Sequence, residues 1–104
     1  MIARLWRGSA TTQNAEGYER HARDTVFPAL ASIPGHRGAI LLRRGTGDGT
    51  EFLVLTLWDS MDAVRGFAGD AAQTAVVEPE ARAVLADFDD VVRHFEVASW
   101  TVSS

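Results

Sequence analysis

The sequence predicts one α+β domain with the element order β-α-β-β-α-β and a four-stranded antiparallel sheet. Three observations lead to this prediction. The 104 residues are enough for a single hydrophobic core, strand-like alternation and helix-like periodicity follow one another along the chain, and an Asp-Gly pair joins two of the strand patterns. We expect the domain to span residues 1–104, because the sequence contains no linker and no internal repeat.

The first half begins with a strand and continues with a long helix. Residues 2–7 alternate between two faces, as strand residues do. A break from Gly8 onwards leads to Thr12, which is the expected N-cap of a helix from residue 13 to about residue 32. Pro28 lies inside the helical pattern, so we expect the last turn to be kinked.

A hairpin is predicted after the Pro34-Gly35 turn. Residues 39–44 form its first expected strand, and residues 52–58 form its second. The connection at residues 45–50 contains an Asp-Gly pair, which favours tight turns because these turns need positive φ.

The strand predicted at residues 52–58 is apolar on both faces, which indicates that both are buried. One face carries Phe52, Val54, Thr56 and Trp58, and the other carries Leu53, Leu55 and Leu57. The helices of so short a chain can cover only one face, so we expect a second copy of the sheet to cover the other. The protein is therefore predicted to be an obligate homodimer. Trp100, in an extended tail, is expected to pack on the partner subunit.

The second half is predicted to contain two short helices and a last strand. Ser60 is a suitable N-cap for a helix that ends at Gly69. Pro79 suits the first position of the next helix, and residues 91–98 form the last expected strand. The apolar stripe of that second helix comprises Ala81, Val84, Leu85 and Phe88.

This element order is the ferredoxin-like split β-α-β arrangement. In that topology the first and third strands are central neighbours, and the fourth strand lies beside the first. Trp6, Trp58 and His94 are therefore expected on three adjacent strands.

Composition excludes several classes of function. A formal charge of -4 and a pI near 5.2 argue against nucleic-acid binding. No apolar run approaches the roughly 20 residues of a membrane span. The absence of cysteine excludes thiolate chemistry and suits a cytoplasmic protein. No group of His, Asp and Glu has the spacing of metal ligands, so no metal is expected.

Three segments resemble the antibiotic biosynthesis monooxygenase domain. They run from Pro34 to Ala39, from Leu55 to Ser60 and from Val92 to Val97, and the resemblance extends over residues 2–98. It implies a dimeric α+β barrel, in which two sheets pack face to face and each subunit has a pocket between its sheet and its helices. The implied function is a monooxygenase that acts without a cofactor on an aromatic, polyketide-type small molecule.

A haem-degrading branch of the same family is a less suitable match. Its pattern has an Asn on the first strand, a Trp at the end of the third and an axial His about ten residues later. Trp58 matches the Trp. The first strand offers Arg4 and Arg7 in place of an Asn, and residues 67–73 contain no His, so the sequence argues against haem degradation.

Cofactor-independent oxygenation requires a base, a donor for the developing oxyanion and a dry aromatic slot. His94 and Trp58 are the predicted catalytic residues, because histidine titrates near neutral pH and Trp58 ends a strand. The predicted substrate-binding residues are Trp6, Tyr18, His21 and Phe67. Purely structural roles for all six stay open. A non-catalytic ligand-binding dimer, or an isomerase or cyclase on the same scaffold, is the alternative function.

Overall fold

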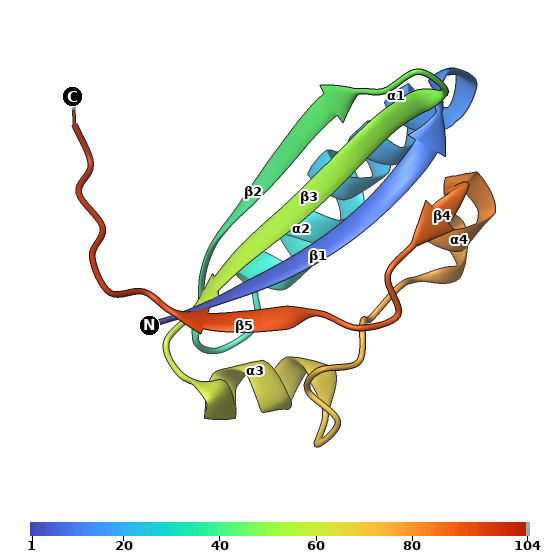
Figure 1. The fold of residues 1–104 in the computed structure, drawn as a ribbon. Coiled ribbons are helices and arrows are strands. Elements are labelled where there is room, and N and C mark those ends of the chain that lie inside the picture. Colours follow the sequence, from blue (N-terminus) through green and yellow to red (C-terminus); the bar gives the residue numbers. More distant parts are fainter. Residues whose placement is uncertain (104) are drawn as a thin grey trace.

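An antiparallel sheet with its long helix on one face forms the centre of the computed structural model, which describes residues 1–103 (Figure 1). The sheet contains β1 (Ile2–Thr11), β2 (His36–Gly45), β3 (Gly49–Trp58), β4 (Asp87–Phe88) and β5 (Arg93–Glu96). Strand β1 is central, because β3 pairs with one of its edges and both β4 and β5 pair with the other. The predicted α+β class and ferredoxin-like order are confirmed. Strand β5 lies inside the last predicted strand, and β4 is an additional short strand before it.

The strand register fixes which residues are neighbours. Arg4 lies opposite Thr56 of β3 on one side and opposite His94 of β5 on the other. Trp6 lies opposite Val54 on the same face of the sheet. The prediction that the first, third and last strands are adjacent is therefore confirmed.

The long helix is interrupted by a wider turn. It consists of α1 (Thr12–His21), a π-helical turn η1 (Ala22–Val26) and α2 (Phe27–Ala31). Its N-cap is Thr11, not Thr12 as the sequence predicted: the Thr11 hydroxyl accepts a hydrogen bond from the backbone N–H of Asn14 (3.3 Å). Pro28 has no N–H to donate, and the helix changes its hydrogen-bonding pattern immediately before it.

The two short helices begin where the sequence predicts. Helix α3 (Met61–Ala68) is capped by the Ser60 hydroxyl and ends at Gly69, whose φ of 84° suits glycine. Helix α4 (Pro79–Val84) starts at its proline. Phe88, expected on the apolar stripe of this helix, lies in β4 because the chain becomes extended at Leu85.

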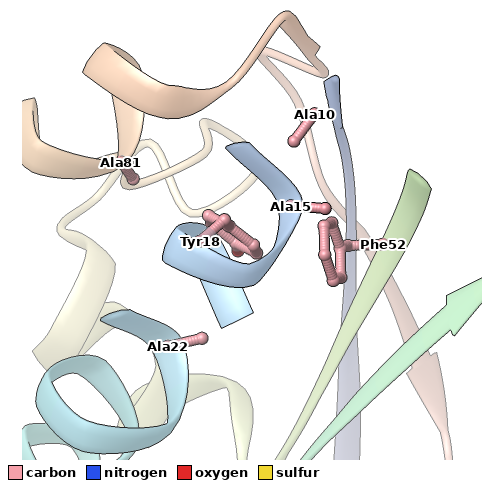
Figure 2. Close-up of a cluster of buried hydrophobic side chains, with 6 residues drawn as sticks. All are labelled: Ala10, Ala15, Tyr18, Ala22, Phe52 and Ala81. Carbon is pink, nitrogen blue, oxygen red and sulfur yellow. The ribbon is translucent and has the colours of Figure 1, made fainter. Parts of the chain in front are cut away.

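The hydrophobic core fills the space between the sheet and the helices in two clusters. In the first, Tyr18 of α1 packs against Phe52 of β3 with ring centroids 4.8 Å apart (Figure 2). Trp58, Val64 and Leu30 belong to the second cluster, at the other end of the sheet. The core is therefore built on the sheet face that carries Phe52, Thr56 and Trp58.

The opposite face of the sheet has no covering element among residues 1–103 (Figure 1), and it carries apolar side chains beside an ion-paired cluster of Arg7, Glu51 and Arg44. Ile40, Leu42 and Phe95 are exposed on this face by 42%, 47% and 48%. The C-terminal tail leads away from the sheet, and its Trp100 is 56% exposed. No helix in the described part of the chain is long and apolar enough to span a membrane.

Candidate functional site

Two cavities adjoin one another: the inner one lies between the sheet and the helices, and the outer one is lined by the helices and the segments next to them. The inner cavity has a volume of about 70 Å³, and the outer one about 390 Å³. Both are lined by Val26, Leu30, Phe67 and Glu78, so these four side chains form their common wall. The inner cavity is also lined by Arg4, Trp6, Tyr18, Ala22, Phe27, Val54, Thr56, Val76, Val77, Ala81 and Val92.

Three of the predicted substrate-binding aromatics line the inner cavity: Trp6, Tyr18 and Phe67. The Trp6 indole is fixed, because its Nε1 donates to the Asp89 carbonyl (2.9 Å) and its ring lies 6.2 Å from that of Tyr18. Gly8 makes this position possible: a Cβ there would lie 2.5 Å from the Trp6 ring. These side chains provide flat apolar surfaces suited to an aromatic ligand.

Trp58 does not line either cavity. Its side chain is fully buried, and its Nε1 donates to the Thr56 hydroxyl (2.9 Å). Its ring stacks on Phe67 with centroids 5.3 Å apart and meets the His36 ring edge-on at 5.1 Å. Trp58 therefore supports the cavity wall by fixing Phe67.

Arg4 is a buried cation in the lining of the inner cavity. It is only 5% exposed, and no carboxylate among residues 1–103 lies within 4.0 Å of it. Its guanidinium donates to the carbonyls of Ala72 (2.5 Å) and Thr74 (3.1 Å), and to Nε2 of His94 (2.9 Å). Burial lowers the pKa of Arg4, but arginine keeps its charge in proteins.

His94 lies next to Arg4 and outside the residues that line the cavities. An arginine can only donate, so Nε2 of His94 must accept the bond and the proton of the neutral ring is on Nδ1. Burial and, to a smaller extent, the charge of Arg4 lower the pKa of His94. The ring is thus held neutral, with its free lone pair directed at Arg4.

Of the three histidines, all within the described residues, His21 is the one that lines a cavity. Its Nε2 is buried without a hydrogen-bond partner and lies 3.6 Å from Oε2 of Glu78, in the wall of the outer cavity. Glu78 also faces Tyr18: burial and this carboxylate together raise the pKa of Tyr18, which keeps the phenol neutral. A histidine, a carboxylate and a phenol therefore meet where the two cavities adjoin.

Sequence reasoning assigned no site role to Arg4 or Glu78. Arg4 shares a strand face with Ile2 and Trp6. The sequence feature that could have pointed to a role for Arg4 in the site is a charged residue on a strand face that is otherwise apolar. Glu78 directly precedes the helix that starts at Pro79, where a carboxylate suits the helix start, but its side chain makes no capping hydrogen bond. Within residues 1–103, no group of three or more His, Asp or Glu side chains could hold a metal ion.

Comparison with known proteins identifies relatives by family and by fold. A profile of the family described as antibiotic biosynthesis monooxygenase matches residues 1–79. No curated protein matches the chain. A candidate antibiotic biosynthesis monooxygenase from Deinococcus radiodurans is 13% identical, with a TM-score of 0.69 over 100% of this chain and 99% of that one.

Two further solved structures have described activities. The haem degrader MhuD of Mycobacterium tuberculosis, solved with two haems in its active site, is 23% identical, with a TM-score of 0.62 over 98% of this chain and 100% of that one. A variant of SnoaB, a cofactor-independent oxygenase of Streptomyces nogalater, is 22% identical, with a TM-score of 0.61 over 95% and 94% of the respective chains. At these identities the likeness establishes a shared fold.

Proposed function

The chain belongs to the antibiotic biosynthesis monooxygenase family, and from this membership we propose that it oxygenates an aromatic, polyketide-type small molecule without a cofactor. The observation that supports this proposal most is the aromatic cavity, in which Trp6, Tyr18 and Phe67 meet a buried Arg4. A flat apolar slot with a strong hydrogen-bond donor meets two of the needs of such a reaction. The fold neighbour SnoaB is a cofactor-independent oxygenase and supports the same class.

The chemistry requires a proton acceptor at the cavity. The substrate loses a proton, and the resulting anion transfers electrons to dioxygen. A carbon–oxygen bond then forms as a hydroperoxide. Loss of water leaves a carbonyl, so one oxygen atom ends in the product and the other in water. The protein must therefore supply a base, a site for the anion and exclusion of bulk water.

We assign the base to His21, because Nε2 of His94 is already occupied by Arg4. Nε2 of His21 has no hydrogen-bond partner, and the residue lines the outer cavity. The Glu78 carboxylate at 3.6 Å would stabilise the imidazolium that forms when His21 takes the proton. Trp58 then acts through Phe67, which it holds against the substrate.

We further propose that the protein works as a homodimer in the cytoplasm. Ile40, Leu42 and Phe95 leave one sheet face apolar and exposed, and a second copy of this face would cover it. The exposed Trp100 would pack on the partner subunit. The lack of cysteine suits the reducing cytoplasm.

The haem-degrading function of MhuD fits the residues of this chain less well. Nε2 of His94 is bonded to Arg4, and Nε2 of His36 is buried beside Trp58. His21 could meet a haem only in the outer cavity, where Glu78 lies beside it.

The proposal is tested by oxygen consumption with anthrone- and hydroquinone-type substrates. We expect the wild type to consume oxygen with at least one of them and His21→Ala to lower kcat by roughly 10²- to 10⁴-fold, the usual contribution of a general base. Arg20→Gln, one residue before His21 on the same helix, is the control, because the Arg20 side chain is 60% exposed and lines neither cavity, and it should keep the wild-type kcat.

Two other outcomes would contradict the assignment. Ligand binding without turnover across the whole panel would identify a binding protein. A Soret band on titration with hemin, followed by loss of the porphyrin, would support haem degradation.

A further inference from the structure

Arg4 differs from the other arginines of the described chain in its surroundings. Among residues 1–103, Arg4 is the one charged residue that is buried, whereas seven other arginines lie within 4.0 Å of a carboxylate. All three hydrogen bonds of Arg4 go to neutral acceptors. A full charge in a desolvated site is costly unless an opposite charge accompanies it, so the site is electrostatically incomplete.

The guanidinium of Arg4 keeps two donors free. Arginine has five N–H groups, and the bonds to Ala72, His94 and Thr74 use three of them. The remaining two, on Nε and Nη2, have no acceptor among residues 1–103. Arg4 lines the inner cavity, and its charge lies 5.8 Å from the Phe67 ring centroid. A planar ligand lying against Phe67 could therefore accept both free donors.

No other charge facing the cavity supplies the missing anion. Tyr18 is held neutral, and His94 accepts a hydrogen bond as a neutral ring. The carboxylate that lines the inner cavity, Glu78, makes no ion pair with Arg4 and lies beside His21. The inner cavity thus has a cation in its lining, and the acid and the base lie in the lining of the outer cavity.

We propose that Arg4 binds an ionised oxygen of the substrate, so that the ligand is an aromatic acid held as its anion, and that His94 is the positioning residue of this subsite. The proposal names the substrate class of the oxygenase proposed above and rests on that function. An anion fixed at Arg4 would extend along Phe67 toward His21, where a second proton can be removed.

The alternative is that Arg4 only tethers the segment around Ala72 and Thr74. Tethering would affect the binding of every ligand to the same degree, because the walls of the cavity would loosen. Anion recognition, in contrast, affects only the ratio between a charged ligand and its neutral isostere. This ratio is therefore the quantity to measure.

The experiment compares 2-naphthoate with 2-naphthamide by calorimetry on the intact protein. A charge-assisted hydrogen bond contributes about 1.5–3 kcal/mol, so we expect the wild type to prefer the carboxylate by roughly 10- to 100-fold. Arg4→Met should bring the ratio to about 1. Arg4→Lys, which keeps the charge, should retain part of the preference and is the second variant if Arg4→Met does not fold. Arg43→Met, at an exposed arginine on β2, is the matched control.

His94 is tested by its capacity to accept from Arg4. His94→Leu should lower the preference for naphthoate, and His94→Gln should restore it, because the Gln carbonyl can accept the same bond. Equal loss in both variants would contradict a positioning role.

A second probe distinguishes a phenolate from a carboxylate ligand. The ionised form of 4-nitrophenol absorbs visible light, so its pKa in the complex can be read directly. A pKa lower in the complex than in free solution would identify the subsite as one for phenolates. Preference for naphthoate without this shift would identify a carboxylate subsite.

The inference and the proposed function can fail separately. Equal affinity of the wild type for naphthoate and naphthamide, or an unchanged ratio in Arg4→Met, would overturn the anion subsite. Absence of oxygen consumption with an intact preference would leave the subsite standing and remove the oxygenase assignment.

Discussion

The sheet face opposite the helices gives the prediction that can be worked out in most detail. If a second copy covers this face, two acidic substitutions on it should separate the dimer. Ile40 and Leu42 are suitable, because they lie two residues apart on the same face of β2, opposite Leu55 and Leu53. The perturbation is the double variant Ile40→Glu/Leu42→Glu.

The exposed fractions set the size of the effect. Burying a whole Leu or Ile side chain contributes about 1.5–3 kcal/mol, so a side chain that is 42% or 47% exposed would gain roughly 1 kcal/mol in the dimer. A two-fold axis places each residue in the interface twice, so the double variant loses roughly 4 kcal/mol of apolar burial. This corresponds to a dissociation constant about 10³-fold higher. The desolvation and repulsion of four carboxylates would increase the change.

Analytical ultracentrifugation over a range of protein concentrations measures this constant. We expect a dimer for the wild type and a folded monomer for the double variant at micromolar concentration. Val91→Glu is the control, because Val91 is 60% exposed and lies outside the strands of the sheet. A monomeric wild type, or a double variant that dimerises as tightly as the wild type, would refute the reasoning.

Two further predictions concern the cavity wall and the buried histidines. Gly8→Ala should displace the Trp6 indole, because the new Cβ would lie 2.5 Å from the ring. Binding of 2-naphthamide, measured by calorimetric titration, should weaken about tenfold (~1.4 kcal/mol). Gly17→Ala is the control and should leave this binding unchanged, because no atom lies within 4 Å of the new Cβ. Burial lowers the pKa of His36 and of His94, so the unfolded chain takes up protons first as the pH falls. The stabilisation that comes from these lowered pKa values is complete above about pH 6.5, so the free energy of unfolding should decrease below that pH. Urea denaturation across this range should show a smaller decrease in His94→Gln than in the wild type.

Local patterns in the sequence were sufficient for the element order and most of its boundaries. The helix from Met61 to Ala68 is an example, because Ser60 caps its start and Gly69 ends it with a positive φ. Such features depend on residues within one turn of each other, so they need no knowledge of the rest of the chain. The alternation of residues 52–58 likewise indicated two buried faces, of which the described chain covers one.

The composition of the site depended on the tertiary structure. Arg4 and His94 are 90 positions apart, and they meet because of the register between β1 and β5. Glu78 meets His21 across the gap between α4 and the long helix. A sequence pattern predicts that a strand exists, but its register is set by the packing of the whole sheet. The sequence therefore determined the scaffold and the aromatic walls, and only the folded chain decided that His94 bonds to Arg4 and that Nε2 of His21 lies beside Glu78 without a hydrogen bond.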